Sequence, residues 1–197
     1  MFNKVNKVKI SEMHFKILNL FTKGFDKEYY IREVNRLVNI SPRTAKLILE
    51  DLEAKAIIES KIRGKIKTFK LKKSSKEYLI LTEQYKKIVF LESNHLINEI
   101  VQNINKKIEG IGIIFGSYAK GIQKKNSDLD IFIIGKYDKK IIKEQSKLFS
   151  IGIDVKNYSL DIFKEHILTD PLIKEVLNDH VIIKNAESLI EEIKWIN

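Results

Sequence analysis

Two aspartates at the start of an apolar strand constrain this sequence more than any other feature. They are Asp128 and Asp130, in the stretch IIFGSYAKGIQKKNSDLDIFII that runs from Ile113 to Ile134. Residues two apart on a strand project from the same face, so both carboxylates are expected to point at one spot. At about 4 Å and an effective dielectric constant of about 20, two such charges repel by about 4 kcal/mol. A hard divalent cation is the simplest compensation, and oxygen ligands of this kind suit magnesium or manganese.

The residues before the aspartates predict a place for phosphate. The run GIGIIFGS is expected to be a strand that ends in Gly116 and Ser117, and SYAKGIQ is expected to begin a helix that ends at Gly121. The start of a helix exposes free backbone amides, which attract phosphate. Gly116 allows a ligand to approach closely, the Ser117 hydroxyl can donate to a phosphoryl oxygen, and Lys120 adds positive charge. We count Ser127, in the turn before the aspartates, with these predicted nucleotide-binding residues.

A third carboxylate is expected at the same edge. The segment SIGIDVKNYS reads as a strand with Asp154 between Ile153 and Val155. If it pairs beside the strand of Asp128 and Asp130, three aspartates could hold two metal ions opposite the phosphate turn. Such an arrangement suits in-line attack on a nucleoside triphosphate, with Asp154 helping to deprotonate the incoming hydroxyl.

The spacing of these residues resembles a known family. Gly116-Ser117, ten residues, then Asp128-Leu129-Asp130 matches the GSx10DxD signature of the minimal nucleotidyltransferases, small members of the DNA polymerase beta superfamily. The resemblance covers roughly residues 94–197 and implies a mixed α/β nucleotidyltransferase fold, a nucleoside triphosphate donor, usually ATP, and magnesium. Some family members adenylylate a small helical partner protein in toxin-antitoxin pairs. Many relatives carry arginine where this chain has Lys120, which implies a single-point grip on the triphosphate.

A plainer interpretation remains for each part of the motif. NSDLD can be a polar turn that leads into a strand with a solvated edge, and Asp154 can be an isolated surface acid.

Basic charge is concentrated in the first half of the chain. Residues 1–90 hold 21 Lys and Arg against 10 Asp and Glu, whereas residues 91–197 hold 15 against 16. This asymmetry indicates a unit that binds a polyanion, joined to a near-neutral one. A general abundance of lysine is the alternative explanation, since only four of the 36 basic residues are arginine.

The first half predicts three helices and a ribbon. Ser11 is a plausible cap for a first helix, Ile31, Val34 and Leu37 form a stripe on a second, and Ser41 with Pro42 starts a third whose apolar residues are Ala45, Ile48 and Leu52. The alternating residues on each side of Arg63-Gly64 are typical of a two-stranded ribbon, with seven basic residues and no acidic one between Lys61 and Lys73.

Residues 11–71 therefore resemble the winged helix-turn-helix family in the order of their elements. By that resemblance the front of the third helix faces the major groove of DNA, and the tip of the ribbon contacts the backbone or minor groove. The residues implied are Arg43, Thr44 and Lys46 on the helix and Arg63 and Lys65 on the ribbon. The alternative is a packing or dimerisation module with a solvated basic face.

The rest of the sequence completes an α+β chain. Residues 76–108 predict two helices broken near ESNH, the first joining the domains or pairing between chains in a homodimer. Ser159 and Asp170-Pro171 are expected to cap helices, HVII to form a strand, and a final amphipathic helix to follow. The four histidines lack ligand spacing. The expected division is a winged helix-turn-helix domain at 1–74, a linker helix at 75–93 and a mixed-sheet nucleotidyltransferase domain at 94–197.

Composition narrows the setting. The absence of cysteine excludes disulfides and thiolate sites, and neither a signal peptide nor an apolar stretch long enough to span a membrane is apparent. We expect a cytoplasmic protein.

Two functions compete at this point. The first is a metal-dependent nucleotidyltransferase that transfers a nucleoside monophosphate, AMP above all, to a hydroxyl of a protein or nucleic acid, with a DNA-binding winged helix. The second is a DNA-binding regulator whose nucleotidyltransferase-like domain only senses a nucleotide or a partner. An antitoxin-like interaction protein overlaps both.

Overall fold

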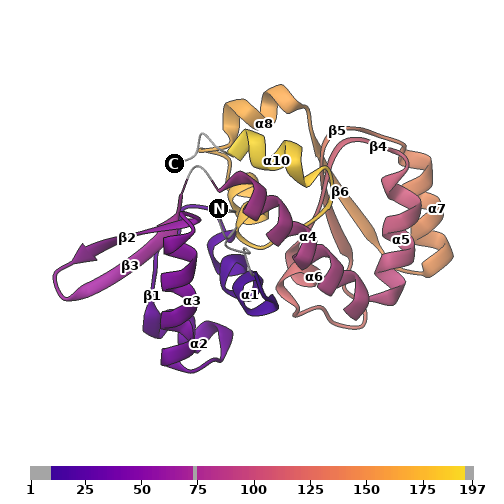
Figure 1. Ribbon diagram of the computed structural model, residues 1–197. Helices are drawn as coiled ribbons and strands as arrows, with labels where there is room; N and C mark the ends of the chain where they lie inside the picture. The colour runs from indigo at the N-terminus through magenta and orange to yellow at the C-terminus, as the bar shows by residue number, and fades with distance from the viewer. Residues whose placement is uncertain (1–9, 73–74, 194–197) are drawn as a thin grey trace, which may run out of the picture.

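Two packed units and a shared helix make up this chain (Figure 1). The computed structural model describes residues 10–72 and 75–193. The N-terminal unit holds three helices and a small antiparallel sheet, and the C-terminal unit holds a mixed four-stranded sheet with helices on both faces. The predicted α+β class is confirmed.

The N-terminal unit contains the elements expected from its capping and turn residues. Ser41 caps the third helix by accepting a hydrogen bond from the Thr44 amide at 3.0 Å, and Asn39 ends the second helix in the left-handed conformation. Strand β1 was not predicted; it pairs with β3, which also pairs with β2. The elements are α1 (Glu12–Phe21), β1 (Tyr29–Tyr30), α2 (Ile31–Val38), α3 (Pro42–Ala54), β2 (Ile58–Arg63) and β3 (Ile66–Leu71).

One predicted core position in this unit is wrong. Leu37 is 52 % exposed, because the buried face of α2 runs through Ile31, Val34 and Val38 and leaves Leu37 at its edge. On α3 the fully buried residue beside Ala45 and Leu52 is Leu49, while Ile48 is only partly buried.

In the C-terminal sheet the strand order is β6-β5-β4-β7, with β5 and β6 parallel and the other pairs antiparallel. Apolar residues on alternate positions of β5 fill two separate cores: Phe132 and Ile134 on one face, Ile131 and Ile133 on the other. Burial on both faces explains why these strands read as continuous apolar runs. The elements are α5 (His95–Asn105), β4 (Ile108–Phe115), α6 (Gly116–Lys120), β5 (Leu129–Tyr137), α7 (Lys139–Phe149), β6 (Ile153–Tyr158), α8 (Leu160–His166), α9 (Pro171–Asn178), β7 (Val181–Lys184) and α10 (Ala186–Ile193).

The expected caps and the expected break between helices are confirmed. Ser159 and Asp170 accept hydrogen bonds from the first amides of α8 and α9, and Asn94 separates α4 (Lys76–Ser93) from α5. Helix α7 was not predicted, and Asp138 caps it by accepting from the Lys140 amide at 2.8 Å. None of the helices described here is long and apolar enough to cross a membrane.

Helix α4 contacts both units. It packs against α1 of the first unit and against β7 and α10 of the second. Tyr85 of α4 stacks on Phe15 with ring centroids 5.3 Å apart. Phe25, from the loop after α1, is buried in the core of the C-terminal unit and stacks on His180 at 5.5 Å. The division at residues 74 and 93 stays a prediction.

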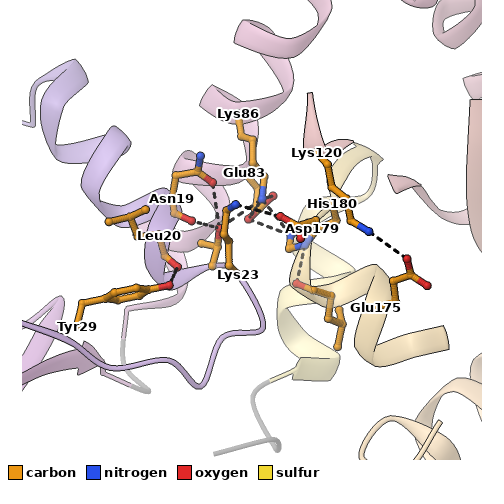
Figure 2. Close-up of polar contacts among 12 residues, drawn as sticks. Asn19, Leu20, Lys23, Tyr29, Glu83, Lys86, Lys120, Glu175, Asp179 and His180 are labelled. Carbon is orange, nitrogen blue, oxygen red and sulfur yellow. Dashed lines mark hydrogen bonds and ion pairs between the residues drawn. The ribbon is translucent and has the colours of Figure 1, made fainter. Parts of the chain in front are cut away.

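A buried ionic cluster lies at this junction (Figure 2). Glu83 of α4 is fully buried and contacts Lys86 at 2.8 Å and His180 Nε2 at 3.3 Å. Lys86 Nζ also lies 3.1 Å from His180 Nε2 and donates to Thr22 Oγ1 at 3.3 Å. Burial alone would raise the pKa of Glu83, but the charges of Lys86 and His180 outweigh it and lower this pKa to about 2. The cluster joins α1, α4 and the start of β7.

Glu83→Ala should destabilise the protein by about 3–5 kcal/mol, because it leaves the buried Lys86 charge without its partner. Urea unfolding followed by circular dichroism measures the loss. Glu77→Ala, an exposed position on the same helix, is the matched control and should change the free energy of unfolding by less than about 0.5 kcal/mol.

The cluster also predicts an acid dependence of stability. The folded pKa of Glu83 lies below its ordinary value of 4.5, so its contribution is complete above pH 4.5 and is lost as the pH falls toward 2. Between those limits wild type should lose more stability than Glu83→Gln, whose side chain does not titrate. Equal losses in urea titrations of the two proteins would contradict the assignment.

Candidate active site

The site begins where strand β4 turns into helix α6. Gly116 has φ +68°, and a Cβ added there would overlap Asp130 Oδ2. Phe115, the last residue of β4, is the cross-strand partner of Asp130. Glycine is therefore required at this turn both for its backbone conformation and for the room that it leaves to the carboxylate. Gly121 ends α6 in the left-handed conformation, as predicted.

The three predicted aspartates come to one edge of the sheet. Asp130 of β5 and Asp154 of β6 are register partners on parallel strands, so their side chains start from the same face. Asp128 directly precedes β5, and a Cβ added to Gly152, just before β6, would overlap its Oδ1. The predicted pairing of the two strands is therefore confirmed.

The electrostatics of Asp130 record this crowding. Burial raises its pKa, and the charges of Asp154, Asp128 and Glu175 raise it further, while Lys156 acts in the opposite direction. Glu175, on α9, was not foreseen from the sequence. No local pattern distinguishes it from other surface glutamates, since only the packing of α9 brings it near the sheet edge.

Lysines hold two of the groups at this edge. Lys156 lies 3.0 Å from Asp154 Oδ2, and Lys120 lies 3.2 Å from Glu175 Oε1, as Figure 2 shows for the second pair. In residues 10–72 and 75–193, no group of three or more histidine, cysteine, aspartate or glutamate side chains is arranged as a metal site. The three aspartates thus lie at one edge of the sheet. Asp154 forms an ion pair there with Lys156, which was not predicted.

The predicted phosphate-binding residues differ in the hydrogen bonds that they form. Gly116 and Ser117 open α6, and the Ile122 amide donates to the Ser117 carbonyl at 3.0 Å. The Ser127 hydroxyl accepts from the Lys124 amide at 2.8 Å, so it stabilises the turn before Asp128.

The predicted DNA-binding residues also fall into two groups. Arg43 and Lys65 are exposed and form no ion pair with any described residue. Arg63 pairs with Glu28 at 3.2 Å, Lys46 lies 3.8 Å from Glu50, and the Thr44 hydroxyl lies 2.8 Å from Ser41 Oγ at the helix cap.

Two further basic groups of the N-terminal unit were not predicted. Arg32 and Arg36 are exposed on α2, and their i, i+4 spacing could have marked them. Lys61, one of the seven basic residues of the predicted ribbon, is also exposed.

Comparison with known proteins gives three matches of different extent. Residues 96–184 match the family model described as "Nucleotidyltransferase domain". A CCA-adding enzyme from Picrophilus torridus is 40 % identical over 65 residues, which make up 33 % of this chain and only 14 % of that enzyme. A solved structure titled "Crystal structure of the toxin-antitoxin with AMP-PNP" is 17 % identical, with a TM-score of 0.32, over 52 % of this chain and 85 % of that one. Residues 96–184, which run from α5 to the end of β7, are therefore similar to this domain family over less than half of the chain.

Proposed function

We propose that this protein transfers a nucleoside monophosphate from a nucleoside triphosphate, with ATP as the preferred donor, to a hydroxyl group. The observation that carries the proposal is the pairing of Asp130 with Asp154 beside a turn whose Gly116 leaves room for the Asp130 carboxylate. The family match over residues 96–184 and the local identity to a CCA-adding enzyme support the same class of reaction.

The chemistry of the donor set suits a divalent cation, although the three carboxylates are not gathered into a metal site in the described residues. Asp128, Asp130 and Asp154 would supply carboxylate oxygens, the ligands that magnesium and manganese prefer. Burial raises the pKa of Asp130, and repulsion from the neighbouring carboxylates, which a cation relieves, raises it further. When bound, the ion would neutralise charge that develops on the transferred phosphoryl group. Asp154 would first have to release Lys156, an exposed pair that contributes little to stability.

The chain's own residues would bind the phosphoryl groups and accept the proton of the hydroxyl. Amides of the Gly116-Ser117 turn and the Ser117 hydroxyl hold phosphoryl oxygens, and Lys120 adds a positive charge once it leaves Glu175. Asp154 accepts the proton of the acceptor hydroxyl. The hydroxyl oxygen bonds to the α-phosphorus, the bond to the bridging oxygen breaks, and pyrophosphate leaves.

The N-terminal unit is proposed to be a winged helix-turn-helix domain that binds duplex DNA. The order α1-β1-α2-α3-β2-β3 and the sheet order β1-β3-β2 support it. So do the unpaired basic groups on α2, α3 and the ribbon, which are suited to phosphate contacts: Arg32, Arg36, Arg43, Lys61 and Lys65. The identity of the acceptor, the binding of a helical partner protein and the formation of a homodimer stay predictions.

A regulator that only senses a nucleotide is the second candidate. The ion pairs of Lys156 with Asp154 and of Lys120 with Glu175 favour it, because both occupy groups that transfer requires.

Asp130→Asn should reduce transfer by at least about 100-fold, because it removes one carboxylate of the donor set. Incubation with α-labelled ATP, magnesium and candidate acceptor RNAs or proteins measures transfer, and fluorescence titration measures ATP binding. Asp161→Asn, at an exposed position of α8, is the control and should be fully active. ATP binding without transfer to any acceptor would favour the regulator, and failure of wild type to bind ATP with magnesium would sink both candidates.

Arg43→Ala and Lys65→Ala should each weaken binding to duplex DNA and lower the slope of log affinity against log salt by about one. Fluorescence anisotropy between low and moderate salt provides the slope. Lys143→Ala, an exposed lysine of α7, should leave it unchanged. Wild-type affinity that does not vary with salt would exclude the proposed interface.

A further inference from the structure

A cavity of about 370 Å³ lies where four parts of the chain meet. Its walls come from α1 and the residues after it, from the second half of α4, from α6 with the residues that follow it, and from the segment that leads from α9 into β7. The volume falls in the range of small-molecule sites, which occur preferentially between structural units. Lys120, which is also proposed to bind the triphosphate, lines it, whereas Ser117, Asp128, Asp130 and Asp154 do not, so the cavity adjoins the proposed catalytic edge.

The charge of the lining favours an anion. Lys16, Lys23, Lys86 and Lys120 line the cavity, and among the described residues that line it Asp179 is the one carboxylate. Lys16 is paired with Glu12 at 2.7 Å. Lys86 is committed to the buried cluster with Glu83. Lys23 and Lys120 are 44 % and 35 % exposed, and their partners, Asp179 at 3.0 Å and Glu175 at 3.2 Å, form ordinary partly exposed pairs. A phosphate could therefore replace these carboxylates at little cost.

The remaining lining suits a nucleobase. Tyr85, Phe90 and Tyr118 offer aromatic surface, and Asn19, Asn94 and Gln123 offer amide donors and acceptors. An aromatic base needs both kinds of contact, because its faces are apolar and its edges form hydrogen bonds.

We propose that this cavity binds a mononucleotide whose phosphate is held by Lys23 and Lys120, at a site that shares Lys120 with the proposed triphosphate contacts but none of the three aspartates. Lys23 follows α1 of the N-terminal unit, and Lys120 closes α6 of the C-terminal unit, as Figure 2 shows for their positions around the buried cluster. The ligand would therefore touch both units and the helix that begins at Gly116.

Binding of fluorescent mant-AMP in EDTA tests the site without a metal ion. Wild type should bind saturably, and Lys23→Gln should bind about tenfold more weakly, since one charge-assisted contact is lost. Asp179→Asn should bind severalfold more tightly, because it frees Lys23 and removes the carboxylate nearest the phosphate. An opposite change in two neighbouring variants cannot come from a loss of folding. Lys27→Gln, an exposed lysine in the same loop, should match wild type.

Two further measurements separate the site from the catalytic edge. Asp130→Asn should keep mant-AMP affinity within about twofold while losing transfer, so that failure of the proposed enzyme and failure of this site are distinguishable. Ribose 5-phosphate should compete about tenfold more weakly than AMP, because it lacks the base. The proposal is overturned if wild type does not bind mant-AMP, if Asp130→Asn abolishes binding, if Lys23→Gln and Asp179→Asn match wild type, or if the two competitors are equal.

Discussion

The alignment of β5 with β6 is the constraint on which the proposed chemistry depends. A shift of one residue between these strands would move Asp154 to the opposite face from Asp130. The alternation along β6 opposes such a shift, because it would exchange the packed Ile153 and Val155 for the exposed Asp154 and Lys156. Packing energy thus maintains a group of carboxylates that repel one another, and the cost of that repulsion is recorded in the raised pKa of Asp130.

A second constraint acts where the two units join. Glu83, Lys86 and His180 lie together at this junction. Glu83 contacts both Lys86 and His180, and Lys86 also contacts His180. His180 Nδ1 also lies 2.9 Å from the Leu177 carbonyl, to which its N–H donates, so Nε2 faces the cluster. The ionic contacts of this cluster require particular chemical groups in particular orientations, unlike the apolar packing around them.

The sequence predicted local features well because their causes are local. The caps at Ser41, Ser159 and Asp170 and the glycine that ends α6 follow from backbone geometry within a few residues. The strands of the catalytic edge and their pairing followed from apolar runs and the spacing of the aspartates.

Features set by distant contacts could not be predicted in this way. Glu83 is polar and lies on a helix between two units, so periodicity gave no sign that it would be buried. Glu175 reaches the sheet edge only through the packing of α9, and Lys156 meets Asp154 only because both extend from the same face of β6. Helix α7 was not predicted, although Asp138 is a local N-cap signal for it.

The burial of Phe25 in the C-terminal core links the folding of the two units. This ring comes from the basic unit and fills the hydrophobic interior of the other, so the C-terminal unit alone has an incomplete interior and the basic unit alone exposes the ring. Loss of either would leave a large apolar surface open to water. Gene rearrangements that separate the halves should therefore yield poorly soluble fragments, and the pair is expected to evolve as one piece.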